Sequence, residues 1–484
     1  MLTLYDIQLR HAFYYLQVVL QRVAESYLES GAVAKHALEM LELEWNNIEA
    51  GHRWASEKST GETGAALRAA YAASAVTVRE WATPPGELAR WAKEGLFAAR
   101  QLDDREAVGR HLSNLGHACD QMGQFRRALT CHQLALAISR EFNNRHTEAE
   151  DLFGMGMALL NLGGAREAVR LSKQSLSILR ELGDRFIEAS ALSNLGLAYE
   201  SLGQTRRAIG CHEQVLTLTR EFEDRRGEAQ ALNQIGSCYE TLGDAKRAIQ
   251  MHERALEIFR SFGDRRGVGQ ALNGLGNAFY DVGDPQRAIE CFEQCLTLAR
   301  ESGDASAESD ALGNLGIAYQ ALGEVRRAIE DHEQALTIDR VSGDLESEGR
   351  SLGNLGRALE AEGDWQGAVS LHEQALGISR QIGDRVAEAH DLCNLASAYS
   401  VAGQPHRVIE NCEQSLALAT KIGLREVEAE DLRLLGVAHR ALEDDAQASD
   451  YFRQSLEVAQ ELHNPTAEQA ALDGLAGTRK AEST

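Results

Sequence analysis

The sequence is poor in the residues that mark secreted, zinc-binding and membrane proteins. Eight cysteines in 484 residues are too few for a disulfide framework, and no two stand at the CxxC spacing of a zinc site. No stretch approaches the roughly 18 consecutive apolar residues of a transmembrane helix. The N-terminal run MLTLYDIQLRHAFYYLQVVLQRV contains charged residues, unlike the apolar core of a signal peptide. We therefore expect a cytoplasmic protein with reduced cysteines.

Lysine is also scarce, and acidic residues outnumber basic ones. Asp and Glu total 73 against 49 Lys and Arg, so the net charge is −24, and only seven of the basic residues are Lys. This charge argues against a nucleic-acid-binding surface and against an anionic membrane as partner. The preference for Arg has two explanations, a GC-rich coding sequence or selection for bidentate pairing with carboxylates.

Catalytic motifs are missing as well. The sequence contains no GxxxxGK[ST] phosphate loop and no GxSxG nucleophile elbow. Nucleotide hydrolysis and serine-nucleophile chemistry are therefore not supported. We expect a protein that is not an enzyme and that holds no cofactor and no metal.

What the sequence does contain is a 40-residue period. Residues 184–225 hold two helical patterns joined by a turn at Gly203, with Gly196 at the centre of the first. The position of Gly196 is occupied in the other repeats by Gly116, Gly156, Gly236, Gly276, Gly316, Gly356, Ala396, Gly436 and Ala476. One helical hairpin cannot bury its own apolar face, so a fixed period of this length indicates a stacked array. We predict an all-α solenoid of antiparallel helix hairpins.

The period divides the chain into four parts. Residues 1–60 are expected to form an irregular helical cap, with helices over 5–28 and 32–56, and residues 61–102 a degenerate first hairpin. Residues 103–462 hold nine 40-residue repeats, and residues 463–484 a C-terminal capping helix and tail. Four of the five tryptophans, Trp45, Trp54, Trp81 and Trp91, lie in the first hundred residues. Large side chains suit the closing of an exposed core end; a docking face for another domain is the alternative.

Each repeat carries signals for the ends and the packing of its helices. Pairs such as Gly263-Asp264 supply a left-handed residue that ends one helix and a carboxylate that caps the next. An Arg in the last turn of most second helices meets the negative end of the helix dipole. Leu192 and Leu195 form an apolar stripe on a first helix, and Gly196 leaves a gap through which the second helix can approach closely.

This pattern resembles that of tetratricopeptide repeats. The residues that carry the resemblance in one repeat are Leu192, Leu195, Gly196, Tyr199 and Ala208. The usual repeat has 34 residues, and the 40-residue form is similar to that of kinesin light chains and the Pins/LGN adaptors. The resemblance implies a right-handed superhelix whose first helices line a concave groove for a protein or an extended peptide.

The N-terminal cap resembles a second family, the bacterial STAND ATPases with NB-ARC modules, in the segment before their tetratricopeptide sensor. The residues that carry this resemblance are Arg10, His11, Ala12, Tyr14, Leu16, Glu44, Asn47, Ile48, Ala50 and Trp54. It implies that the chain is the ligand-sensing region of a signalling or defence ATPase, with a fused or partner NTPase. The alternative is a free-standing adaptor that assembles a protein complex through its groove. No oligomeric state follows from the sequence.

A row of histidines recurs at one position of the second helix. Its members are His132, His212, His252, His332 and His372. Successive members stand about one repeat apart, roughly 10 Å, which is too far for a shared metal. We interpret them as packing residues.

The tetratricopeptide resemblance also implies a row of groove residues, two positions before the central Gly. They are Asn114, Asn194, Asn314, Asn354 and Asn394, with Gln234 of similar chemistry. An Asn side chain offers a donor and an acceptor, so such a row can hold an extended peptide without dictating its sequence. The alternative is that these side chains bond neighbouring helices.

Charged residues one turn from this row predict a polarised groove. The basic members are Arg350, Arg357, His390, Arg433 and Arg440, and the acidic ones are Asp120, Glu150, Glu200, Glu240 and Asp281. We expect the basic section to attract an acidic or carboxylate-bearing ligand. Alternatively, Arg433 pairs with a nearby acid such as Glu430 and faces solvent. The Lys and Asn residues of carboxylate-clamp tetratricopeptide domains are not reproduced as a set.

Overall fold

The computed structural model describes residues 4–14, 47, 50–51, 53–54 and 85–481, and every secondary-structure element among them is an α-helix. The chain divides into two compact units, Met1–Gly263 and Asp264–Thr484, which are treated separately below. None of the described helices combines the length and the apolar character that a membrane crossing requires.

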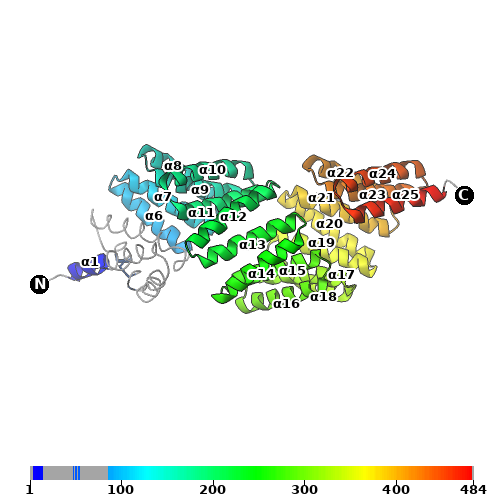
Figure 1. Ribbon diagram of the computed structural model, residues 1–484, viewed down its shortest axis with the longest axis horizontal. Coiled ribbons are helices and arrows are strands. Elements are labelled where there is room, and N and C mark those ends of the chain that lie inside the picture. The colour runs from blue at the N-terminus through cyan, green and yellow to red at the C-terminus, as the bar shows by residue number, and fades with distance from the viewer. Residues whose placement is uncertain (1–3, 15–46, 48–49, 52, 55–84, 482–484) are drawn as a thin grey trace. The chain divides into compact units, whose positions relative to one another are not determined.

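The first unit contains the N-terminal helix and nine consecutive helices that pack in chain order (Figure 1). They are α1 (Leu4–Tyr14), α6 (Pro85–Gln101), α7 (Arg105–Gln121), α8 (Phe125–Glu141), α9 (Arg145–Asn161), α10 (Ala165–Leu182), α11 (Arg185–Glu200), α12 (Thr205–Glu221), α13 (Arg225–Thr241) and α14 (Ala245–Ser261). From α6 onward each helix contacts the next, and the first helices of neighbouring hairpins also meet, α7 with α9 and α9 with α11.

The second unit repeats this arrangement. Its helices are α15 (Arg265–Asp281), α16 (Pro285–Ser302), α17 (Ala305–Ala321), α18 (Val325–Ser342), α19 (Leu345–Glu362), α20 (Trp365–Ile382), α21 (Arg385–Val401), α22 (Pro405–Ile422), α23 (Arg425–Ala441), α24 (Asp445–Glu461) and α25 (Pro465–Ala481). The first helices α17, α19, α21, α23 and α25 contact one another in sequence. From α6 to α25 a helix begins every 20 residues, so the predicted all-α array of hairpins is confirmed.

The predicted helix ends are also confirmed. Gly183 ends α10 in the left-handed conformation at φ 72°, and Asp184 then accepts a hydrogen bond from the backbone N–H of Ile187 at 3.1 Å. The same use of an N-cap carboxylate is found at Asp224, Asp264, Asp304, Asp344 and Asp384. Free backbone N–H groups at these six helix starts are thereby satisfied, and the boundaries recur in register.

The central Gly is the site of close approach, as predicted. A Cβ added at Gly196 would lie 2.5 Å from Cε1 of His212, and one added at Gly276 would clash with the ring of Phe292. Around this contact Leu192, Leu195 and Tyr199 are buried in the core of the first unit. The ring of the second helix therefore fills the space that the missing side chain of the first helix leaves.

The Arg that ends a second helix has a partner that the helix dipole alone does not predict. Arg180 Nε donates to Glu188 Oε1 at 2.7 Å, which links the last turn of α10 to the first turn of α11. The same pair, eight residues apart, occurs as Arg140–Glu148, Arg220–Glu228, Arg300–Glu308, Arg340–Glu348 and Arg380–Glu388. These arginines are half exposed, so each pair contributes a modest amount, on the order of 1 kcal/mol or less.

Much of the predicted N-terminal cap lies outside the described residues, including Trp45 and Trp81. Within the described part, Trp91 is fully buried, and Trp54 Nε1 donates to Gln8 Oε1 at 2.9 Å. The division into a cap, a degenerate first hairpin and nine repeats stays a proposal. All eight cysteines are free, and all but Cys131 are buried.

Candidate peptide-binding surface

The predicted groove residues of the second unit lie on four first helices: Asn314 on α17, Arg350, Asn354 and Arg357 on α19, His390 and Asn394 on α21, and Arg433 and Arg440 on α23. We call the following seven side chains the first-helix face: Asp310, Asn314, Arg350, Asn354, Arg357, His390 and Asn394. Spacings of three and four residues place side chains on one side of a helix. A hydrogen bond from Arg350 Nη2 to Asp310 Oδ1 at 2.5 Å links two of these helices across this side.

The asparagines of this face differ in what they bond. Asn314 Nδ2 donates to Asn273 Oδ1 of α15 at 2.8 Å, so this amide connects neighbouring first helices. Asn354 Oδ1 accepts from Arg357 Nη2 at 2.6 Å on its own helix. Asn394 is partly exposed, and no hydrogen bond of its side chain is found among the described residues. Its amide is therefore available to a ligand.

Asn194, in the first unit, has a different environment. Its side chain is only 4% exposed, and Nδ2 donates to Ser172 Oγ of the preceding hairpin at 3.3 Å. An amide packed in this way serves the contact between hairpins, which is the alternative that sequence reasoning left open. Asn114 also has interactions of its own in the structure.

Two of the predicted ligand-reading arginines are paired with carboxylates of this chain. Besides the pair of Arg350 with Asp310, Arg433 donates from Nε and Nη2 to the two carboxylate oxygens of Glu430, at 2.8 and 2.6 Å. The sequence left two alternatives for Arg433, a role in the groove or a pair with Glu430, and the structure contains the pair. Both charges are largely neutralised locally, so neither arginine is the first choice for an incoming anion.

Arg440 lies elsewhere. Its guanidinium carbon is 5.6 Å from the centre of the Phe452 ring, and a Cβ added at Gly477 of α25 would lie 2.6 Å from its Nη1. The side chain thus packs over an aromatic ring and against the C-terminal helix. It contributes to the contact among α23, α24 and α25.

Arg357 is the arginine of the first-helix face without a carboxylate partner in the described part of the chain. It is exposed, and its hydrogen bond goes to the neutral amide of Asn354. His390 is exposed on the next first helix. Partial desolvation and the nearby charge of Arg357 lower the pKa of His390, while Glu426 raises it. A cation, a neutral imidazole and a free amide at Asn394 thus lie on adjoining helices.

The predicted acidic section requires a correction. His212 Nε2 lies 2.7 Å from Glu200 Oε1, and His212 is 1% exposed. Equivalent pairs are His132 with Asp120, His252 with Glu240 and His372 with Glu360. These acids lie at the ends of first helices and bond the histidine row inside each hairpin. Asp120, Glu200 and Glu240 are therefore not groove residues that repel an acidic ligand.

The histidine row itself is buried, as a packing role requires. His132, His212, His252, His332 and His372 are at most 1% exposed. Sequence reasoning missed the acids that bond them, although a signal was present, because an Asp or Glu stands 12 residues before four of the five. The exception is His332, which has Gln320 at that place.

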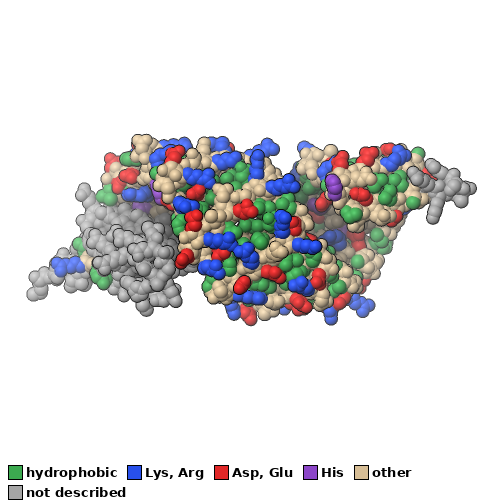
Figure 2. All heavy atoms as spheres, viewed as in Figure 1, with side chains coloured by type: hydrophobic (Ala, Val, Ile, Leu, Met, Phe, Trp, Pro, Cys, Tyr) green, Lys and Arg blue, Asp and Glu red, His purple; other side chains and the backbone are tan. Residues whose placement is uncertain are grey.

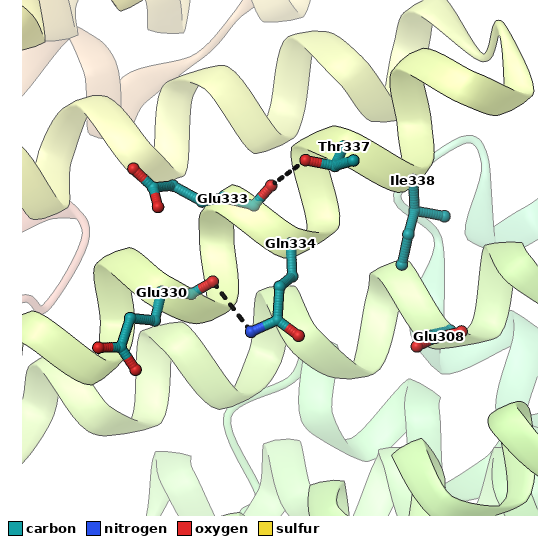
Figure 3. Close-up of a pocket in the computed structure, with 6 residues that line it drawn as sticks. All are labelled: Glu308, Glu330, Glu333, Gln334, Thr337 and Ile338. Atoms are coloured by element: carbon teal, nitrogen blue, oxygen red, sulfur yellow. Dashed lines mark hydrogen bonds between the residues drawn. The ribbon is translucent and has the colours of Figure 1, made fainter.

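A hollow on the second unit was not predicted from the sequence (Figure 3). It is lined by Glu308 of α17 and by Glu330, Glu333, Gln334, Thr337 and Ile338 of α18. Gln334 and Thr337 bond backbone carbonyls of their own helix, at 3.2 and 2.8 Å. The hollow lies on a second helix and is acidic, so it does not suit the carboxylate-bearing ligand expected for the first-helix face. Figure 2 shows acidic and basic side chains interspersed on the visible surface.

Two groups of side chains among the described residues could hold a metal ion. One consists of His117, Asp120 and His132, and the other of Glu200, His212 and Cys238. Each group joins side chains of adjacent helices, which neither the CxxC spacing nor the distance between successive histidines of the row indicates. These groups were therefore not predicted from the sequence.

Comparisons with known proteins agree with this architecture. Tetratricopeptide-repeat models match residues 148–221, 227–301, 305–381 and 385–461, and a second such model matches residues 112–145. No curated protein sequence matches the chain.

Two solved structures with TM-scores of 0.50 or more show the same kind of fold, and a third shares part of the sequence. The apo form of the quorum sensor NprR from B. thuringiensis has 11% sequence identity and a TM-score of 0.55, covering 77% of this chain and 98% of that chain. A Rap protein complexed with competence and sporulation factor has 14% identity and a TM-score of 0.50, covering 78% of this chain and 98% of that chain. A Podosopora anserina protein with kinesin light chain nearly identical TPR-like repeats has 25% identity and a TM-score of 0.35, covering 40% of this chain and 95% of that chain.

Proposed function

Because the chain belongs to the tetratricopeptide-repeat family, we propose that it is a non-catalytic scaffold that binds a protein or an extended peptide on its first-helix face. The observation that carries the proposal is the open hydrogen-bonding capacity on α19 and α21. Arg357 has no carboxylate partner in the described part of the chain, and the amide of Asn394 has no bond there.

The chemistry of this face defines the ligand. A guanidinium that is not neutralised by the protein binds a carboxylate through two parallel hydrogen bonds. The amide of Asn394 can donate to a backbone carbonyl and accept from a backbone N–H. The ligand is therefore an extended segment that places an acidic side chain or a C-terminal carboxylate near Arg357 and its backbone near Asn394.

The experiment compares asparagines that have different surroundings. The wild-type chain is used to capture partners from a lysate of the source cell, and the affinity of a retained partner is then measured by titration. Asn394→Ala should weaken binding by about 0.5–1.5 kcal/mol, the contribution of one hydrogen bond. Asn194→Ala is the matched control, because Asn194 is buried against Ser172; it should lower stability and leave affinity unchanged. Equal affinity of wild type and Asn394→Ala for every partner would contradict the proposal.

The biological setting is a separate part of the proposal. We propose that the chain is the sensor region of a STAND-type signalling or defence ATPase, on the strength of the cap residues that resemble that class. The hydrogen bond between Trp54 and Gln8 supports a cap in which α1 packs against residues near 54. An in-frame NB-ARC coding sequence upstream would support this setting. A reading frame that opens at Met1, with no such sequence, would favour the adaptor alternative.

A further inference from the structure

Three side chains with metal-ligand chemistry converge in the first unit where α11 ends. Glu200 closes α11, His212 lies on α12 and Cys238 lies on α13. One ligand atom from each, a carboxylate oxygen, an imidazole nitrogen and a sulfur, lies within 4.8 Å of the others. His212 and Cys238 are both 1% exposed, whereas the Glu200 side chain is 27% exposed.

The cysteine is an exception within the chain. At the position of Cys238 the other eight repeats have alanine, namely Ala118, Ala158, Ala198, Ala278, Ala318, Ala358, Ala398 and Ala438. Alanine satisfies the packing at this position, so the hairpin does not need a sulfur to fold. The described residues form four acid–histidine pairs, and Glu200–His212 is the one with a cysteine at this position of the following helix; the other three have Ala158, Ala278 or Ala398 there.

The combination of ligands selects a class of ion. Carboxylate, imidazole and thiolate together suit Zn²⁺ and similar divalent transition metals, whereas Mg²⁺ and Ca²⁺ prefer oxygen ligands. Three protein ligands leave one position of a tetrahedral site for water. We propose that Glu200, His212 and Cys238 bind one divalent transition-metal ion of the zinc class.

Binding requires two local changes. The bond of 2.7 Å between His212 Nε2 and Glu200 Oε1 must open, and the thiol proton of Cys238 must pass to solvent, because the thiolate is the ligand. In a tetrahedral site with metal–ligand bonds of roughly 2.0–2.3 Å, two ligand atoms lie farther apart than the present 2.7 Å between His212 and Glu200, so the carboxylate must shift to admit the ion. Glu200, the most exposed of the three, is the side chain that can shift, and it also provides the route from solvent.

Cobalt is the probe that distinguishes this site from the group of His117, Asp120 and His132, which has no thiol. The reduced full-length chain is titrated with Co²⁺, and the charge-transfer absorption of a thiolate–cobalt bond is recorded. The wild type should develop this band with a stoichiometry of one ion, and Zn²⁺ should remove it by displacement. Cys238→Ala should lose the band and keep its helical content, because eight sister repeats have alanine there.

A second variant tests whether the same three residue types create a metal site at another place in the chain. Glu360 and His372 form the equivalent pair in the second unit at 2.9 Å, and Ala398 stands where the thiol would be. Ala398→Cys in the Cys238→Ala background should restore a thiolate–cobalt band. A wild-type chain without the band, or a band that survives Cys238→Ala, would overturn the proposal. A folded Ala398→Cys variant without a band would overturn it as well, because the three positions would then be insufficient.

Discussion

Two neighbouring hairpins of the second unit, α17–α18 and α19–α20, have the same shape in their interiors and different electrostatics. In both, the ring of a histidine lies against the central Gly of the first helix, His332 against Gly316 and His372 against Gly356. His372 Nε2 lies 2.9 Å from Glu360. Both ring nitrogens of His332 are buried and have no hydrogen-bond partner among the described residues. The contact between the histidine ring and the central Gly thus recurs with the 40-residue period. The hydrogen-bond partners of the ring, in contrast, differ from one hairpin to the next.

This difference affects the surface. Glu360 lies three residues after Arg357 on α19, at a spacing that suits an ion pair on a helix. Its carboxylate instead bonds His372, and Ser397 Oγ donates to its second oxygen at 3.1 Å. Because Glu360 is used in the interior, Arg357 keeps an exposed charge for a ligand. The buried pair of Glu360 with His372 and the proposed binding by Arg357 are therefore linked, because Glu360 and Arg357 lie on the same helix, α19.

The largest expected effect comes from breaking the shared steric fit. Gly316→Ala places a methyl group against the His332 ring and should lower the free energy of unfolding by roughly 3 kcal/mol, near the upper end for overpacking. Gly313→Ala on the same helix is the matched control, since an added Cβ there meets nothing within 4 Å. It should be neutral or raise stability by up to about 1 kcal/mol. Urea denaturation of both variants provides the measurement.

The second effect is a pH dependence of stability that comes from His332. Burial, and secondarily Arg357, lower the pKa of His332 to about 4 from 6.5. The unfolded chain therefore takes up a proton first as the pH falls, and stability is lost below the unfolded pKa. Between about pH 7.5 and about pH 5 this should cost about 2 kcal/mol.

The comparison variant for this pH dependence is His332→Phe, which introduces the residue found at the equivalent positions Phe292 and Phe452. Between about pH 7.5 and about pH 5, the free energy of unfolding of His332→Phe should fall by about 2 kcal/mol less than that of the wild type. Subtraction between the two proteins removes the opposite contribution of Asp431, whose pKa burial raises to about 7. Identical pH profiles of unfolding would show that the His332 ring is not held neutral in the core.

A smaller effect follows from exchanging the polar partners of the two hairpins. Glu360→Gln replaces a carboxylate by an amide at His372, so the free energy of unfolding should fall by about 1 kcal/mol. Gln320→Glu offers His332 a carboxylate at the equivalent place and should raise the pKa of that ring. Both are measurable by NMR titration of the histidines together with denaturation. No change in either ring would mean that the residue 12 positions before the histidine does not control it.

The sequence predicted what depends on neighbours along the chain. Gly183 and Asp184 adopt the predicted stop and start because a left-handed residue and a capping carboxylate act within one turn. The stripe of Leu192 and Leu195 and the gap at Gly196 are periodic, so they predict the packing of a hairpin. The helix boundaries followed from these local signals.

The partners of charged side chains on different helices were not predicted from the sequence, although the spacing of 12 residues was a signal for the acid–histidine pairs. Arg180 meets Glu188 over a turn, Glu200 meets His212 across a hairpin, and Arg350 meets Asp310 of the preceding repeat. An Asp or Glu of a repeat can therefore face the groove, bond a side chain in the interior or pair with an arginine. The residue type alone does not show which of these environments it has. For this reason the predicted acidic section was wrong for three of its members, and the pair of Arg350 with Asp310 was missed. The pair of Arg433 with Glu430, three residues apart on one helix, was one of the two alternatives that the sequence left open.

The most direct test of the proposed function compares two arginines of first helices, Arg357 and Arg433. A partner retained by the wild-type chain is titrated against Arg357→Gln and Arg433→Gln over a range of salt concentrations. Arg357→Gln should weaken binding about 10-fold or more, as expected for loss of a charged hydrogen bond, and should reduce the salt dependence. Arg433→Gln should leave affinity nearly unchanged, because Glu430 already neutralises that guanidinium. Equal affinities of the two variants, or a larger loss for Arg433→Gln, would contradict ligand binding at the first-helix face.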